Sequence, residues 1–135
     1  MADIHAAVTD THALLFHSTG RKQLGPAART LFGAAEEGRA LIYVPAIVVV
    51  EIGLLARAVR INLHRPVRQF FGDLFSNPAF QMHPLDAAQS FDADELRFTR
   101  DHFDALVVAA ARDLDVPLIT RDQAITASGL VKTIW

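Results

Sequence analysis

The sequence contains no cysteine among its 135 residues. This absence excludes a disulfide scaffold, a zinc site built on thiolates and a cysteine nucleophile. The chain also lacks internal repeats, low-complexity tracts and a linker, and 51% of its residues are hydrophobic against 21% charged. This length and composition are typical of one globular unit, so we expect a single domain over residues 1–135.

Targeting and membrane-spanning signals are missing as well. The first residues include no basic region, and Asp10 lies where a signal peptide would be apolar. Residues 40–56 approach the length of a membrane span, but Pro45 and Glu51 interrupt them, and a charge near a bilayer centre is costly. Together with the lack of cysteine, these features favour a soluble cytoplasmic protein with no membrane partner.

Acidic residues are absent from residues 52–72, although the net charge of the whole chain is −2. A net negative charge argues against a protein that coats nucleic acid along its whole surface. A local positive region could still contact nucleic acid, so the distribution of charge along the chain matters more than its sum. The acid-free segment carries four arginines, which are Arg57, Arg60, Arg65 and Arg68. They form a candidate phosphate-contacting surface, with a solvated helix face as the alternative interpretation.

Short apolar stretches alternate with helical patterns along the chain. The stretches predict strands at residues 6–9, 41–44, 80–83, 116–120 and 131–135. The periodic segments between them predict helices at residues 26–38, from Pro45 to about Arg60, and at 66–75, 86–98 and 103–114. This alternation predicts an α/β fold of three layers, with a central, mainly parallel sheet of about five strands flanked by helices.

Carboxylates follow two of the predicted strands directly. Asp10 follows the first strand and Asp122 the fourth, at the edge where ligands bind in such sheets. Asp104 lies in the first turn of the last predicted helix, and Glu51 lies in the helix after the second strand. The three aspartates also have structural interpretations, as a helix N-cap, a turn residue and a first-turn acid that favours the helix dipole.

Glu51 is harder to explain structurally. The residues three and four positions away from it are Ile47, Val48, Leu54 and Leu55, so its own helix offers no counter-charge. An arginine from elsewhere in the chain would compensate for its burial, and so would a cation shared with the other acids. Oxygen ligands alone select a hard ion such as Mg²⁺ or Mn²⁺, and such an ion supports hydrolysis of phosphodiesters.

Five motifs, taken in this order, resemble the PIN-domain nucleases, and specifically the VapC-like toxins of bacterial toxin–antitoxin modules. They are VTDTHALLF, VVVEIGLLA, HFDALVVAAA, PLITRD and VKTIW, and they span essentially the full chain. Each motif alone is weak, and their order and spacing carry the resemblance. It implies a PIN-like fold, a ribonuclease that uses Mg²⁺ or Mn²⁺, a cognate antitoxin protein that silences it, and a homodimer.

Position by position, the resemblance implies four acids that hold metal and catalyse: Asp10, Glu51, Asp104 and Asp122. Asp101, one helical turn before Asp104, is a supporting residue or an alternative third ligand. Thr11 would orient a carboxylate or a water molecule. The four arginines of the acid-free segment would contact RNA or the antitoxin.

Two histidines flank these motifs. Some relatives carry proline where this chain has His102, which we expect to be an exposed loop residue although it could reach substrate phosphate. His12 lies beside the proposed site, either as a substrate contact or simply as the start of the first helix.

Other functions fit the sequence less well. A phosphatase that uses Asp10 as a nucleophile requires a second aspartate two residues later as acid and base, but this chain has His12 there. A response regulator requires a lysine near the end of the sequence that pairs with phosphate, but Lys132 lies inside the last predicted strand. The remaining alternative is a catalytically silent PIN-like domain that binds RNA or protein, although the presence of all four acids argues against decay of the site.

Overall fold

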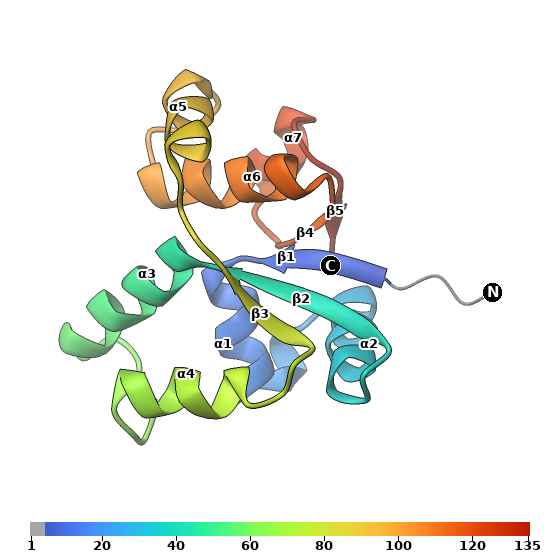
Figure 1. The fold of residues 1–135 in the computed structure, drawn as a ribbon, viewed down its shortest axis with the longest axis vertical. Helices are drawn as coiled ribbons and strands as arrows, with labels where there is room; N and C mark the ends of the chain where they lie inside the picture. The colour runs from blue at the N-terminus through green and yellow to red at the C-terminus, as the bar shows by residue number, and fades with distance from the viewer. Residues whose placement is uncertain (1–4) are drawn as a thin grey trace.

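The computed structural model describes residues 5–135, and it contains one parallel five-stranded sheet (Figure 1). In chain order the strands are β1 (His5–Thr9), β2 (Ala40–Pro45), β3 (Phe80–His83), β4 (Leu118–Ile119) and β5 (Thr133–Ile134). Their order across the sheet is β3-β2-β1-β4-β5. Ala7 lies opposite Ile42 on one side of β1, and Val8 lies opposite Leu118 on the other. The predicted α/β fold with a central parallel sheet is therefore confirmed.

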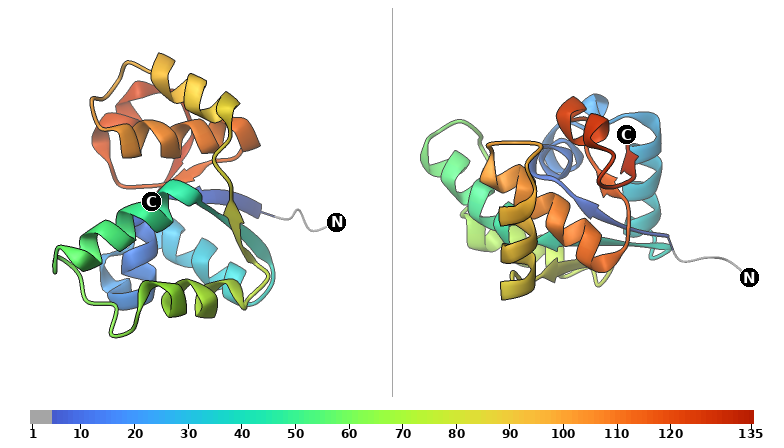
Figure 2. Two further views of the ribbon diagram at one scale, coloured as in Figure 1. Left: turned by 60° about the vertical axis from the view of Figure 1, so that its left-hand side comes forward. Right: turned by 90° about the horizontal axis from the view of Figure 1, so that it is seen from above.

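The helices cover both faces of this sheet. They are α1 (Thr11–Thr19), α2 (Pro26–Glu36), α3 (Ala46–Arg57), α4 (Val67–Phe75), α5 (Ala87–Glu95), α6 (His102–Leu114) and α7 (Gln123–Ser128). Helices α1, α2 and α4 lie on one side, and α5, α6 and α7 lie on the other (Figures 1 and 2). Helix α3 extends from the carboxyl end of β2. None of the helices in residues 5–135 is long and apolar enough to cross a membrane.

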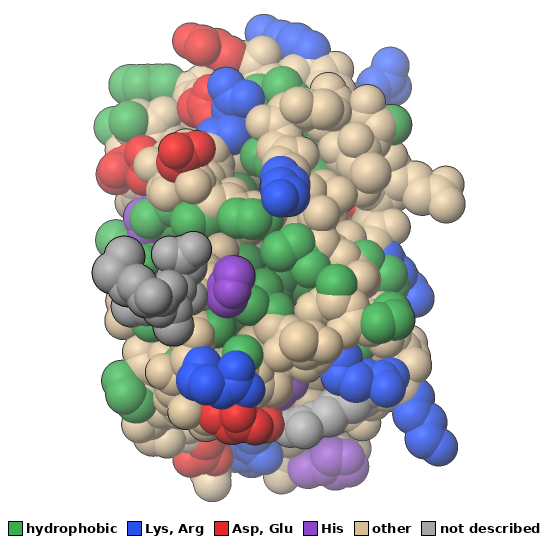
Figure 3. Space-filling model, turned by 90° about the vertical axis from the view of Figure 1, so that its right-hand side faces the viewer, with side chains coloured by type: hydrophobic (Ala, Val, Ile, Leu, Met, Phe, Trp, Pro, Cys, Tyr) green, Lys and Arg blue, Asp and Glu red, His purple; other side chains and the backbone are tan. Residues whose placement is uncertain are grey.

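The two faces at the ends of the strands differ. Figure 3 turns the amino ends of β1 and β2 toward the viewer, and hydrophobic side chains fill the middle of that face between charged groups above and below. The carboxyl ends of β1 and β2 lie on the opposite side, at the left of Figure 1, where α3 and the beginning of α6 meet. The predicted site residues lie at this second end.

Several predicted boundaries were too long. Strand β4 begins at Leu118 because the Val116 N–H closes the end of α6 by donating to the Ala111 carbonyl. Helix α5 ends at Glu95 rather than continuing to Phe98, and the side chains of Leu96 and Phe98 pack partly buried against the core. Helix α7 was not predicted, since its six residues include a single buried side chain.

Helix α3 ends in a Schellman motif, three residues earlier than the pattern suggests. The Arg60 N–H donates to the Leu55 carbonyl, and the Val59 N–H donates to the Ala56 carbonyl. The motif needs a left-handed residue, and Val59 takes that conformation with φ of 55°. A β-branched residue there is an outlier because its side chain crowds the backbone. Val59 is also 88% exposed, so its side chain gains little from packing.

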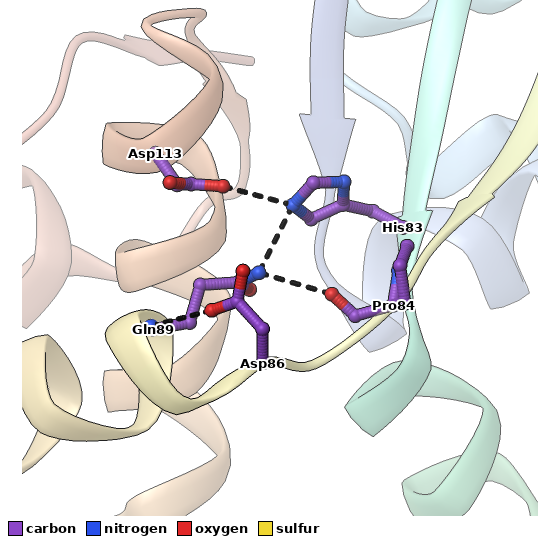
Figure 4. Close-up of polar contacts among 5 residues, drawn as sticks. All are labelled: His83, Pro84, Asp86, Gln89 and Asp113. Carbon is purple, nitrogen blue, oxygen red and sulfur yellow. Dashed lines mark hydrogen bonds and ion pairs between the residues drawn. The ribbon is translucent and has the colours of Figure 1, made fainter.

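A polar network ties the edge strand β3 to α5 and α6 (Figure 4). His83 Nε2 lies 3.3 Å from an Asp113 carboxylate oxygen and 3.1 Å from Nε2 of Gln89. The buried Gln89 side chain also donates to the Pro84 carbonyl at 3.0 Å, and its backbone N–H donates to Asp86. These contacts position α5 over α6.

The last residue of the chain packs against Gly25. The Ala27 N–H donates to the Trp135 carbonyl at 3.2 Å, and the Trp135 ring meets the edge of Phe16 at 6.3 Å between centroids. A Cβ atom on Gly25 would lie only 2.6 Å from Cδ1 of Trp135. The close approach of the chain end to α2 therefore requires glycine at position 25.

Candidate active site

The acids predicted from the sequence line one cavity of about 550 Å³. They come from four segments: the β1–α1 junction, helix α3, the first turn of α6 and the β4–α7 junction. The complete lining is Asp10, Thr11, His12, Glu51, Asp101, Asp104, Val107, Arg121, Asp122 and Gln123. The structure thus brings together all six predicted residues of the acidic site, whose metal-binding and catalytic roles stay predictions.

Asp10 and Asp122 combine a structural role with a place in the cavity. Asp10 Oδ1 accepts the Ala13 N–H at 2.8 Å and caps α1. Asp122 Oδ1 accepts the Ile125 N–H at 2.9 Å and caps α7. Because a carboxylate has two oxygens, the cap holds the side chain in place and leaves the second oxygen for a ligand. The capping interpretation and the ligand interpretation are therefore compatible.

The start of α6 supplies two more carboxylates. Asp101 Oδ1 accepts the N–H groups of Phe103 at 2.8 Å and Asp104 at 3.3 Å, so Asp101 caps the helix that carries Asp104. His102 is exposed, as expected, but it is the first residue of α6 rather than a loop residue. It is not part of the cavity lining.

Glu51 contacts a hydroxyl group rather than a cation. Thr11 is 3% exposed, and its Oγ1 donates a hydrogen bond to Glu51 Oε1. Among the side chains that the structure describes, none forms an ion pair with Glu51. The arginine partner considered from the sequence is therefore not found in this part of the chain, and Thr11 takes the orienting position predicted for it.

Burial and crowding of acids perturb the cavity. Burial raises the pKa of the Asp104 carboxyl from 3.8 to about 7, and the carboxylates of Asp101, Asp122, Glu51 and Asp10 add to the rise. Burial also raises the pKa of Asp10, whereas a hydrogen bond from the Thr120 hydroxyl opposes the rise. Burial is the largest cause of both shifts, and at Asp104 the four neighbouring carboxylates add to it.

The donor set fits a hard divalent cation by its chemistry. All acidic groups present oxygen, and a cation among them would relieve the repulsion that raises the pKa of Asp104. Within residues 5–135, no group of three or more His, Cys, Asp or Glu side chains is arranged closely enough to hold an ion by itself. Mg²⁺ does not require such a cage, since it keeps several waters and uses one or two carboxylates together with substrate phosphate.

Arg121 is a lining residue that the sequence reasoning missed. Its guanidinium lies 4.8 Å from the centroid of the Phe16 ring, which places a positive charge at the edge of an otherwise acidic cavity. The feature of the sequence that could have indicated Arg121 as a lining residue is its position between the end of β4 and Asp122. The hydroxyl group of Thr120, the residue directly after β4, accepts the Asp122 N–H at 3.1 Å.

The four arginines of the acid-free segment lie outside the acidic cavity. Arg65 pairs with Asp73 at 3.3 Å and lies over the Phe70 ring at 5.1 Å, so it stabilises α4 locally. Arg57 and Arg68 are exposed, and Arg60 lines a second cavity that adjoins the first. Their contact with RNA or antitoxin stays a prediction.

Solved structures that contain chains similar to this one include the following three. VapBC2 from Rickettsia felis bound to a promoter DNA fragment matches with a TM-score of 0.68 and 14% identity, over 95% of this chain and 96% of that one. A toxin–antitoxin complex from Klebsiella pneumoniae matches with a TM-score of 0.64 and 20% identity, over 93% of this chain and 94% of that one. FitAcB from Neisseria gonorrhoeae matches with a TM-score of 0.62 and 18% sequence identity, over 94% of this chain and 95% of that one.

At these identities the likeness establishes the fold alone. A comparison with curated proteins finds no match. The model of the family described as PIN domain, however, matches residues 7–127, which include most of β1, all of β2 to β4 and the whole lining of the acidic cavity. The chain therefore belongs to the PIN domain family.

Proposed function

We propose that the protein is a ribonuclease that uses Mg²⁺ or Mn²⁺ to hydrolyse RNA phosphodiester bonds. The observation that carries the proposal is the convergence of Asp10, Glu51, Asp104 and Asp122 on one cavity at the carboxyl ends of the strands. Burial raises the pKa of Asp104 and the neighbouring carboxylates add to the rise, and a divalent ion would offset their repulsion. A bound ion also draws in substrate phosphate and lowers the pKa of water.

Each of the other cavity residues has its own role in this proposal. The caps of α1 and α7 fix Asp10 and Asp122 as ligands. The Thr11 hydroxyl orients Glu51. Asp104, in the first turn of α6, is the further carboxylate that would face the ion, whose charge would oppose the rise that burial and the neighbouring acids produce in its pKa. Arg121 approaches the substrate phosphate from the edge of the cavity.

We further propose that the nuclease is the toxin of a bacterial type II module, acting in the cytoplasm as a homodimer and silenced by a small antitoxin protein. The solved structures to which this chain is similar include complexes described as toxin–antitoxin, and the likeness extends over more than nine tenths of each chain. Exposed Arg57 and Arg68 fit contacts with an acidic partner or with RNA.

The nuclease is tested by incubating the protein with structured and single-stranded RNAs in Mn²⁺, in Mg²⁺ and in EDTA. We expect cleavage that EDTA stops and that Asp10→Asn abolishes. The matched control is Glu95→Gln, an exposed acid at the end of α5 outside the cavity, which keeps full cleavage. Cleavage that survives EDTA or Asp10→Asn contradicts the proposal.

The same assay separates the enzyme from a binding domain. Retention of RNA without cleavage in any metal favours the silent PIN-like domain. The toxin proposal is tested separately by inducible expression, in which the wild type arrests growth and Asp10→Asn does not. Coexpression of a cognate antitoxin is expected to restore growth.

A further inference from the structure

A second cavity, of about 410 Å³, adjoins the acidic cavity and shares one lining residue with it, His12. It lies between α1 and the segment that follows α3. Its lining is half apolar and includes Leu15, Phe16, Leu55 and Leu63, of which Leu15 and Leu63 are buried. The two cavities are therefore neighbours at the end of the sheet where the acids gather.

Rings and a guanidinium separate the two cavities. The Phe16 ring lines the second cavity and has three neighbours: Arg121 lies 4.8 Å above it, His12 lies 6.2 Å away, and Trp135 meets its edge. Arg121 and His12 both line the acidic cavity. An aromatic face beside a cation is a surface on which a nucleic-acid base stacks.

The rim of the second cavity carries groups that read base edges. Gln23 and Asn62 each provide an amide, and Arg60 provides a guanidinium, all exposed. Asn62 Oδ1 accepts the His64 N–H at 2.8 Å, which holds the loop and leaves the amide N–H groups as donors. Two amides and a cation above apolar side chains provide hydrogen-bonding groups for the edge of an unstacked base.

The backbone holds this rim in one conformation. Two non-glycine residues with positive φ enclose it, Val59 at 55° and His64 at 60°. The Schellman motif at the end of α3 fixes the first, and the Asn62 side chain bonds to the second. A strained backbone retained beside a cavity is typical of a site that positions a ligand.

We propose that this second cavity binds one base of a single-stranded RNA, next to the phosphodiester that lies in the acidic cavity. The inference rests on the proposed nuclease function and assigns base preference to Gln23 and Asn62. Paired bases are stacked and cannot enter, so the enzyme selects unpaired segments. The shared residue His12 and the neighbouring Arg121 contact the backbone between base and phosphate.

The first test is cleavage of a randomised RNA pool, followed by sequencing of the cut ends. The wild type is expected to favour one base at a position beside the cut. Asn62→Asp keeps the oxygen that accepts the His64 N–H but removes the amide donors, so the preference at that position falls by about tenfold. Gln23→Ala weakens it as well. The control is Gln69→Ala, an exposed amide of α4 outside both cavities, which leaves the preference unchanged.

A second measurement does not depend on cleavage. Short oligoribonucleotides of uniform base are added to Asp10→Asn in EDTA, and the side-chain amide signals of Gln23 and Asn62 are followed by NMR. Shifts at both amides with one base, and a smaller Gln23 shift in Asn62→Asp, support the inference even if the wild type cleaves no RNA. Wild-type cleavage with unaltered base preference in both variants, or binding that leaves both amides unshifted, overturns it.

Discussion

Single carboxylates in this protein serve the fold and the cavity at once, and the two roles respond differently to substitution. Asp122 caps α7 through one oxygen and lines the cavity. Asp122→Asn keeps an oxygen acceptor for the Ile125 N–H, whereas Asp122→Ala does not. We expect both variants to lose cleavage, but only the alanine variant to lose about 1 kcal/mol of unfolding free energy in urea titrations. Equal stability of the two variants would contradict the cap.

Glu51→Gln tests whether a bound ion, and not a cationic side chain, compensates for the charge of Glu51 in the cavity. Glutamine still accepts the Thr11 hydrogen bond, so the fold persists while the charge is removed. We expect cleavage to fall by at least about 100-fold, the scale on which one preorganised group commonly acts. In EDTA the melting temperature stays the same or rises, because one repelling charge is gone. A clear drop would indicate a cationic partner of Glu51 instead.

Asp104 makes the stability of the metal-free protein depend on pH. Its folded pKa of about 7 exceeds its ordinary value of 3.8, so between these values the native state holds a proton that the unfolded state lacks. The unfolding free energy therefore falls as pH rises through this window and levels off above it. Denaturant titrations in EDTA from about pH 4 to about pH 8 should show a steeper fall in the wild type than in Asp104→Asn.

Added Mn²⁺ provides the control for this prediction. The ion offsets the repulsion among the ionised acids, so it should restore more stability to the wild type at high pH than to Asp104→Asn. An identical pH profile in the two proteins would mean that Asp104 titrates normally.

The positions of the acids could be predicted from the sequence because two of them directly follow strands that the apolar pattern identifies. Their convergence follows from parallel pairing alone. The sequence predicted that Thr11 orients a carboxylate or a water molecule, but it could not identify Glu51 as that carboxylate, because the two residues lie 40 positions apart. Arg121 was missed for a related reason, because its contact with Phe16 is set by packing and not by periodicity.

At the scale of elements, the end of α3 stores strain that glycine would release. Val59 occupies the left-handed position of the Schellman motif, where glycine pays no side-chain penalty. We expect Val59→Gly to raise the unfolding free energy by about 1 kcal/mol, measured in urea. The control is Ala58→Gly, one residue earlier with φ of −79°, where glycine only adds flexibility to the unfolded chain and lowers stability.

Strands β1, β2 and β3 were predicted more accurately than β4 and β5 for a physical reason. Strands β1 and β2 are long and well buried, so their apolar runs are distinct. Strands β4 and β5 pair over two residues each, and tertiary contacts decide where they stop. Helix α7 depends on the Asp122 cap and one buried residue, Ile125, which is too little for a periodic pattern.

At the scale of the whole molecule, the close contact between Gly25 and Trp135 ties the chain end to α2. Gly25→Ala places a Cβ atom 2.6 Å from the Trp135 ring, so either the ring or the end of the chain must move. We expect a loss of about 1–3 kcal/mol in thermal or urea unfolding. The control is Gly33→Ala within α2, where a Cβ meets no atom within 4 Å and helix propensity favours alanine.

The sheet order also governs when the cavity can exist. Strand β1 lies between β2 and β4, so the segment that carries Asp122 takes its place beside Asp10 only after most of the chain has left the ribosome. A growing polypeptide that already exposes Asp10 and Glu51 still lacks Asp104 and Asp122. Whatever reaction the protein performs, the segment that carries Asp122 must be synthesised before that reaction can begin.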